Sequence, residues 1–432
     1  MRARLLLVAA VAAGLAGCAT ASTSVPAGGQ ASSTAATTVP SATASSTSRS
    51  AAATTSPAGT PSPSSLTGSP GAWCASPTSP FLDTNQLTGV EFVSPSQGWA
   101  VGQGAILATT DGGADWAPQL TGRLDLTAVD FVNASDGWAV GTDTLLATTD
   151  GGAHWTPLSE PCPLIRSVHF TSALDGYAVA GGKVPGADGF GTEIPDMGGV
   201  VLVTHDGGHI WGMMAAPANA QTVCFGSAQD GWLGAGGRLF RTRDGGRYWT
   251  PLTAPEAGAH GSVSASMSVE CAGRDAVWAV RSSYGGGMNQ QPHVAYHADA
   301  AGLTGIYAEG QFRSPGDPAT SSPGGYAGPF SALSSQASVF IDSCGPCDGF
   351  GSAPWAVAAN AGATLTEEGN VGGLSIADAA AFLSPQAGWV AGTYNQEINP
   401  ARSRAQQRIV MTSDGGKTWR TEWASPWVTP RR

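Results

Sequence analysis

Two short stretches decide the fold: Gly98-Trp99-Ala100-Val101-Gly102 and, shortly after it, Thr110-Asp111-Gly112-Gly113-Ala114-Asp115-Trp116. The pair returns as Gly137-Trp138-Ala139-Val140-Gly141 followed by Thr149-Asp150-Gly151-Gly152-Ala153-His154-Trp155. Because self-similarity of this kind is the signature of repeat architectures, each pair predicts one structural unit that stacks on its neighbours.

The first motif has seven copies, centred on the aromatic residues Trp99, Trp138, Tyr177, Trp232, Trp278, Trp355 and Trp389. In five copies a phenylalanine stands seven residues before the aromatic residue, at Phe92, Phe131, Phe170, Phe225 and Phe382. Apolar residues alternate with other residues around both positions, which predicts two successive β-strands.

The second motif is an acidic turn, kept best at Asp111, Asp150, Asp206, Asp244 and Asp414, with degenerate copies at Asp299 and Glu367. The spacing supports the last copy, because twelve residues separate Trp355 from Glu367 just as they separate Trp99 from Asp111. Asp-Gly-Gly between apolar runs predicts a tight hairpin, in which the carboxylate accepts backbone N–H bonds and the glycines take positive φ. We therefore expect these carboxylates to be structural, not catalytic or metal-binding.

Each repeat then supplies four strands, and the sequence predicts an all-β protein with a single β-propeller. Seven four-stranded blades are the preferred count, with six or eight as alternatives. The 60 glycines and 29 prolines agree with many short strands joined by turns.

The acidic turn resembles the Asp-box, or BNR repeat, of bacterial sialidases and sortilin-type domains. The sequence pattern Gly-Trp-Ala-Val-Gly followed by Thr-Thr-Asp-Gly-Gly most resembles the photosystem II stability/assembly factor family, which is WD40/YVTN/BNR-like. The resemblance extends over residues 80 to 432. The resemblance implies a propeller that binds a protein partner, and it does not imply photosynthesis. A sialidase-like or other glycoside hydrolase is the alternative, although the Arg-Ile-Pro sequence that sialidases carry before the first box is missing here.

The N-terminus predicts export and a lipid anchor. Residues 1–17 read as a signal peptide, with Arg2 and Arg4 before a short apolar run, and Leu15-Ala16-Gly17-Cys18 matches the bacterial lipobox. Acyl chains on Cys18 would hold the protein at the outer face of the cytoplasmic membrane. Residues 18–72, rich in Ser, Thr, Ala and Pro, are expected to be a disordered tether with a reach on the order of 40 Å, and residues 73–432 the propeller.

Six further cysteines suggest disulfides in an exported protein, with fifteen connectivities left open: Cys74, Cys162, Cys224, Cys271, Cys344 and Cys347. Cys344-Gly-Pro-Cys347 has thioredoxin spacing without a βαβ context, so a structural role is expected. The net charge of −11 and the lack of a basic stripe argue against a nucleic-acid partner. We expect a monomer with no cofactor and no metal.

Insertions single out the candidate site. More residues separate the aromatic residue from the acidic turn in the third, fifth and seventh repeats than in the others. The extra residues lie between the second and third strands of these repeats. These loops, with the connection over residues 302 to 338, are expected on the face opposite the acidic turns, where rigid scaffolds commonly carry binding loops. The candidate ligand-face residues are Lys183, Asp188, Glu193, Tyr284, Asn289, His293, Tyr394, Glu397, Arg402 and Arg404. Amides beside aromatic rings suit sugars or peptides, so we expect non-catalytic binding of a protein or glycan, as an aid to an envelope complex.

Overall fold

The computed structural model describes residues 86–161, 165–180, 199–252, 265–283, 292–309, 318, 320–343, 353–399 and 402–428. The predicted signal peptide, Cys18 and the tether lie outside these residues, as do Cys74, Cys162, Cys344 and Cys347. All regular elements in the described part are strands. None of the described residues forms a helix long and apolar enough to cross a membrane.

The strands form six antiparallel sheets in chain order. The first sheet has six strands, β1 (Leu87–Phe92), β2 (Gly98–Thr109), β3 (Ala117–Phe131), β4 (Gly137–Gly141), β5 (Thr144–Thr148) and β6 (Thr156–Pro157). The second has β7 (Ile165–Phe170), β8 (Gly176–Ala180), β9 (Gly199–Thr204) and β10 (Gly212–Ala216). The third has β11 (Ala220–Phe225), β12 (Gly231–Ala235), β13 (Arg238–Thr242) and β14 (Thr250–Pro251).

The other three sheets also have four strands each. The fourth has β15 (Ala265–Cys271), β16 (Val277–Ser283), β17 (His293–Asp299) and β18 (Gly302–Ala308). The fifth has β19 (Tyr326–Ser334), β20 (Ala337–Ser343), β21 (Pro354–Ala359) and β22 (Thr364–Asn370). The sixth has β23 (Ile376–Ser384), β24 (Ala387–Asn399), β25 (Arg402–Thr412) and β26 (Arg420–Ala424).

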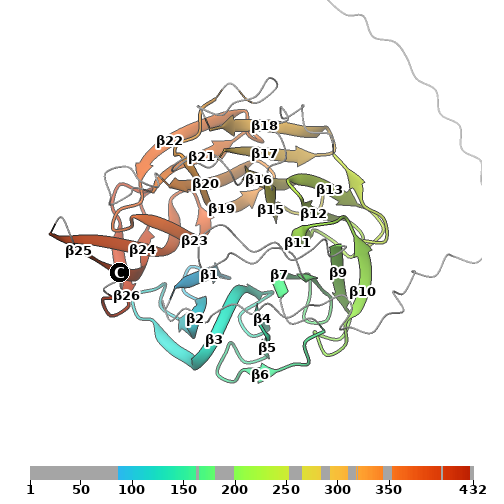
Figure 1. Cartoon of the computed structure of the whole chain (residues 1–432), viewed down its shortest axis with the longest axis horizontal. Helices are drawn as coiled ribbons and strands as arrows, with labels where there is room; N and C mark the ends of the chain where they lie inside the picture. The colour runs from blue at the N-terminus through green and yellow to red at the C-terminus, as the bar shows by residue number, and fades with distance from the viewer. Residues whose placement is uncertain are drawn as a thin grey trace, which may run out of the picture. The chain divides into compact units, whose positions relative to one another are not determined.

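The sheets stand around a common centre, each with its first strand innermost (Figure 1). Neighbouring inner strands contact one another around the whole ring, from β3 to β7, β11, β15, β19 and β23, and from β23 back to β1. The described residues therefore form an all-β propeller, which confirms the predicted fold class.

The preferred count of seven separate blades was wrong, because the structure has six sheets. The reason lies in two long strands of the first sheet. β2 carries both the Trp99 strand and the strand that enters the first acidic turn, and β3 carries both the strand that leaves this turn and the Phe131 strand. The first two sequence repeats consequently share one six-stranded sheet.

The sixth copy of the repeat was placed wrongly. Trp355 lies in β21, the third strand of its sheet, and Glu367 lies within β22, where it pairs with Ala356. The hairpin between these strands is made by Asn360 and Ala361, which have φ of 53° and 54°. The twelve-residue step was therefore a coincidence. The connection over residues 302 to 338, expected to be a loop, contains β18 and β19.

Aromatic stacking joins the repeats. Trp99 stacks on Phe131 with ring centroids 3.5 Å apart and planes 7° from parallel, and Trp138 stacks in the same way on Phe170 at 3.4 Å. The Trp99 indole N–H donates to the carbonyl of Gly151 in the next acidic turn at 3.1 Å. Trp99, Trp138 and Trp389 thus each contact both the phenylalanine strand and the acidic turn of the following repeat, which explains why the motifs recur together.

The ring closes through side chains. The last sheet contains only strands from the C-terminal part of the chain, and β1 stays in the first sheet. Across this junction Trp389 stacks on Phe92 at 3.5 Å, and the Gln86 amide donates to Asp378 at 3.2 Å. No strand exchange clasps the ring within the described residues, so closure depends on these contacts.

Candidate functional site

The acidic-turn carboxylates accept hydrogen bonds within their own turns. Asp111 Oδ1 accepts bonds from the Asp115 N–H at 3.0 Å and from the Thr109 hydroxyl at 2.8 Å. The same two bonds occur at Asp150, Asp206, Asp244 and Asp414. At Asp150 a further bond from the His154 ring contributes most to lowering the carboxyl pKa to about 2. These aspartates hold hairpins in shape.

The structure describes only some of the predicted ligand-face residues. Lys183, Asp188, Glu193, Tyr284 and Asn289 lie outside the described residues. Tyr394 and Glu397 lie in β24, and Arg402 and Arg404 lie in β25.

His293 is not a loop residue, so its placement in a ligand-face loop was wrong. It begins β17 and is 2% exposed. Its Nε2 lies 3.1 Å from an oxygen of Asp342, whose other oxygen accepts a bond from the Tyr307 hydroxyl at 3.3 Å. Its side chain is part of a buried polar network.

The seventh repeat forms an arm, defined here as residues 394–399 and 402–405. β23 pairs with β24 only as far as Thr393, whereas β24 and β25 remain paired to their ends at Asn399 and Arg402. The ends of β24 and β25 therefore continue past the sheet, and Figure 1 draws them projecting from the ring.

One face of the arm combines arginines with aromatic rings. The Arg404 guanidinium lies over the Trp427 ring at 3.9 Å, and the Arg408 guanidinium lies over the Tyr394 ring at 3.7 Å. Arg404 also donates through Nε to Gln396 Oε1 at 2.9 Å. Sequence reasoning missed Arg408 and Trp427. The period-two spacing from Arg404 to Arg408 was the available signal for the first, and Trp427 belongs to no motif.

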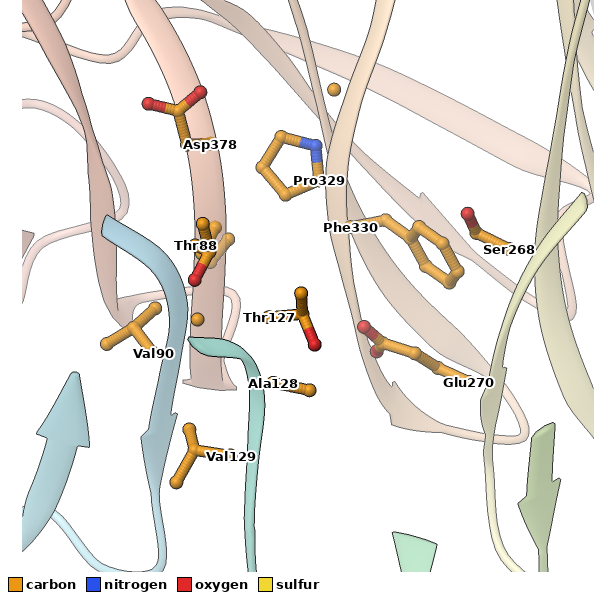
Figure 2. A pocket seen from close by; sticks show the side chains of 14 residues that line it. Thr88, Val90, Thr127, Ala128, Val129, Ser268, Glu270, Pro329, Phe330 and Asp378 are labelled. Atoms are coloured by element: carbon orange, nitrogen blue, oxygen red, sulfur yellow. The ribbon is translucent and has the colours of Figure 1, made fainter. Parts of the chain in front are cut away.

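A second candidate site is a cavity at the centre of the ring, of about 270 Å³ (Figure 2). Residues of β1, β3, β15, β19 and β23 line it, and its polar side chains are Thr88, Thr127, Ser268, Glu270 and Asp378. Among the described residues, no three His, Cys, Asp or Glu side chains form a group that could hold a metal ion.

The carboxyls on the inner strands link neighbouring strands. Glu91 accepts the Phe131 N–H at 2.9 Å, and Asp130 accepts the Phe170 N–H at 2.7 Å. Glu270 accepts the Ala332 N–H at 2.7 Å. Each acceptor lies one residue before the phenylalanine position of its own repeat and bonds to the phenylalanine position of the next one.

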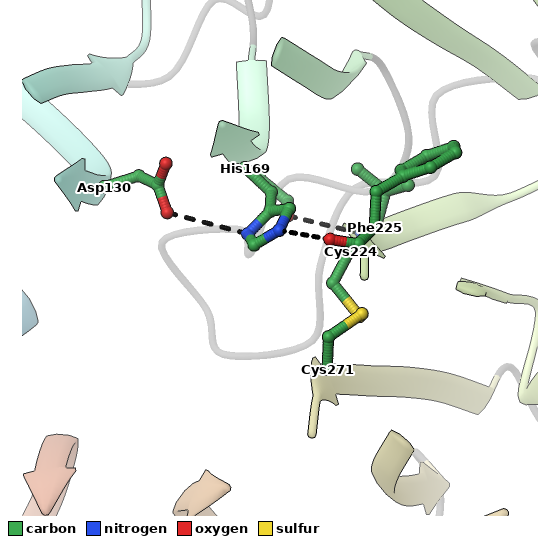
Figure 3. The surroundings of a disulfide bond; sticks show 7 residues. Asp130, His169, Cys224, Phe225 and Cys271 are labelled. Atoms are coloured by element: carbon green, nitrogen blue, oxygen red, sulfur yellow. Dashed lines mark hydrogen bonds and ion pairs between the residues drawn. A yellow bond between two sulfur atoms is a disulfide. The ribbon is translucent and has the colours of Figure 1, made fainter. Parts of the chain in front are cut away.

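His169 and Cys224 hold the same position in the next two inner strands (Figure 3). His169 Nε2 bonds to the carbonyl oxygen of Phe225 at 2.8 Å. Cys224 forms a disulfide with Cys271, with their Cα atoms 5.6 Å apart. The disulfide is therefore a covalent form of a link that the other repeats make with hydrogen bonds.

Burial changes the acidity of these inner carboxyls. It raises the pKa of Glu270 to about 7 and the pKa of Asp378 to about 6. The pKa of Glu91 is raised as well, by burial first and then by the nearby charge of Asp130. Burial at the centre of the ring consequently shifts the pKa of each of these three carboxyls toward neutral pH.

We predict that the protein loses stability as the pH rises from 4.5 to 7, and that Glu270→Gln removes part of this loss. In that window the unfolded state releases a proton that folded Glu270 keeps, so the unfolding free energy falls with rising pH. Relative to the wild type, the unfolding free energy of the variant should rise by up to about 3 kcal/mol over this pH range. Chemical unfolding across this pH range measures it, with Glu397→Gln as an exposed control. A constant difference between Glu270→Gln and the wild type would contradict the prediction.

The fold and its turns define the chain as an Asp-box β-propeller. Residues 79–160 match the family model described as photosynthesis system II assembly factor YCF48, which confirms the resemblance drawn from the motifs. No curated protein matches the sequence.

Among solved structures that match at low identity, the first agrees at the level of the fold. An ancestral GH74 enzyme matches 79% of this chain with a TM-score of 0.50 and 14% identity, and the match covers 55% of that enzyme, so it shows the fold alone. YCF48 from Cyanidioschyzon merolae matches 80% of this chain and 86% of its own, with 17% identity and a TM-score of 0.37. U3-55K matches 72% of this chain and 89% of its own, with 9% identity and a TM-score of 0.49.

Proposed function

We propose that this protein is an exported, lipid-anchored propeller that binds a protein or glycan partner without catalysing a reaction. The arm carries the proposal. It is a two-stranded projection from a closed scaffold, and its arginine, amide and aromatic side chains are partly exposed. Arginine and aromatic residues are enriched at protein interfaces.

The roles of the described carboxylates support a non-catalytic function. Glycosidases need two carboxyls that face the scissile bond and its water. Here the acidic-turn aspartates accept their own backbone N–H groups, and Glu91, Asp130 and Glu270 accept those of the next repeat. These groups are used by the fold, and their removal is expected to affect stability first.

The N-terminal sequence supplies the proposed location. Lipidated Cys18 would hold the chain on the outer face of the cytoplasmic membrane, and the tether would allow the propeller to meet a neighbouring envelope complex. We also propose that the protein aids the assembly or stability of such a complex, because the description of the matched family model names an assembly factor.

Photo-cross-linking in living cells tests the proposal. A photoreactive residue replaces Ile398, which is 53% exposed on the arm, or in a control Tyr248, which is 71% exposed on an acidic turn. We expect one discrete partner from the Ile398 position and none from the control, and a soluble exported form from Cys18→Ser. A glycosidase activity of the full chain on sialosides or xyloglucan would overturn the non-catalytic proposal.

A further inference from the structure

We propose that the arm binds an extended acidic polypeptide segment, through the surface that we call the arginine face. This face consists of Tyr394, Gln396, Arg404, Gln406, Arg408 and Trp427, and the exposed Ile398 lies next to it near the end of β24. The inference rests on the proposed function and names the class of partner that the arm takes.

Strand register places these side chains together. Tyr394 pairs with Gln406, and Gln396 pairs with Arg404, so these four side chains share one face of the hairpin. Alternation places Arg408 on this face as well, whereas Ile398 lies next to it, where the register shifts between Glu397 and Asn399. Trp427 joins them because its neighbour Val428 pairs with Ala405, which lies on the other face. Glu397 also lies on that other face by alternation, so the register leaves the arginine face without a carboxylate among its described residues.

The two guanidiniums are held in place before any partner arrives. Stacking over Trp427 and Tyr394 fixes their planes, and bonds to Gln396 and Gln406 fix the direction of their N–H edges. A preorganised guanidinium loses less conformational entropy when it meets a carboxylate, and its fork matches the two carboxylate oxygens. In a chain of net charge −11, such a fixed pair of cations selects a partner with local negative charge.

The same geometry favours a peptide over an acidic sugar. Sugars stack on open aromatic faces, but here guanidiniums cover one face of both Tyr394 and Trp427. Ile398 adds an exposed aliphatic side chain that suits an apolar residue between acidic ones. β23 stops pairing at Thr393, so on that side the arm continues past the sheet edge, where an extended chain can lie alongside.

Fluorescence anisotropy with the purified full chain in detergent tests the inference. The probe is a labelled peptide of alternating Glu and Leu, compared with the same peptide carrying Lys in place of Glu and with a labelled oligoglucuronate of equal charge. We expect the acidic peptide alone to bind. The double variant Arg404→Gln/Arg408→Gln should weaken this binding at least about tenfold.

The control removes the same charge elsewhere. Arg243→Gln/Arg247→Gln changes two exposed arginines on the fourth acidic turn and should weaken binding less than about twofold. Ile398→Glu, at an exposed position that the fold does not need, should also weaken binding strongly. It keeps the test decisive if the arginine variant unfolds.

Three results would overturn the inference: equal losses in both arginine double variants, tight binding of oligoglucuronate that Arg404→Gln/Arg408→Gln also abolishes, or no binding of the acidic peptide. A partner cross-linked in cells from another part of the propeller, with no peptide binding at the arm, would leave the proposed function standing and remove this inference alone.

Discussion

Replacing Trp389 by alanine is expected to open the ring between its last and first sheets and to lower the unfolding free energy by about 3–5 kcal/mol. Trp389 is 1% exposed, stacks on Phe92, and donates its indole N–H to the Gly112 carbonyl at 2.9 Å. Because no strand crosses this junction in the described part of the ring, loss of the Trp389 contacts leaves only the remaining side-chain contacts, such as the Gln86–Asp378 bond, to hold β1 against β23.

Trp138→Ala is the matched control. Trp138 stacks on Phe170 and donates to the Gly207 carbonyl with nearly the same geometry, but the main chain runs directly from its sheet to the next one. We expect both variants to lose similar packing energy in denaturant unfolding. Hydrogen exchange should separate them, with fast exchange in β1 and β23 for Trp389→Ala alone. Slow exchange in both strands would show that the closing junction is no weaker than the others.

The fold was predictable because its two motifs each have a local and a long-range role. Gly112 and Gly113 take φ of 79° and 94°, as a tight turn needs, and the Gly112 carbonyl also accepts the indole of Trp389. Such a motif tolerates little substitution, so it stays visible in the sequence. The count of sheets was not predictable, because it depends on whether β2 and β3 remain continuous between repeats, and no residue pattern signals this.

The fifth sheet shows the limit of spacing arguments. Ser338 and Val339 stand in its second strand, β20, where other repeats have Gly-Trp, and both are buried. The visible tryptophan, Trp355, lies one strand further on. The core needs a large apolar side chain at this level of the sheet, and a residue on either β20 or β21 can provide it. The Gly-Trp motif is therefore not required on β20.

The candidate site was predictable in part. Insertion length pointed to Tyr394 and Arg404, because a longer hairpin must extend past its sheet. It could not reveal Trp427, which reaches the arm from the C-terminal segment by tertiary packing, nor the burial of His293.

Removing the Cys224–Cys271 disulfide with serine at both positions is expected to cost about 4 kcal/mol, from the loop-closure entropy of residues 47 apart in sequence. This junction lacks both the ring stacking and the carboxylate bond to a backbone N–H that join the first two repeats. Cys271 replaces the phenylalanine, so Trp232 has the Arg241 guanidinium over its ring at 4.6 Å, and Cys224 replaces the side chain that accepts a backbone N–H. The covalent bond thus compensates for two missing interactions.

A second double variant separates chain entropy from the missing contacts. Cys224→Asp with Cys271→Phe would rebuild the pattern of Asp130 and Phe170, with a carboxylate on the next N–H and a ring beside Trp232. We expect it to recover part of the stability that the double serine variant loses, and to lose less stability than the wild type when reductant is added. Equal stabilities of wild type and double serine variant without reductant would contradict this account, because they would mean that non-covalent contacts already hold the junction.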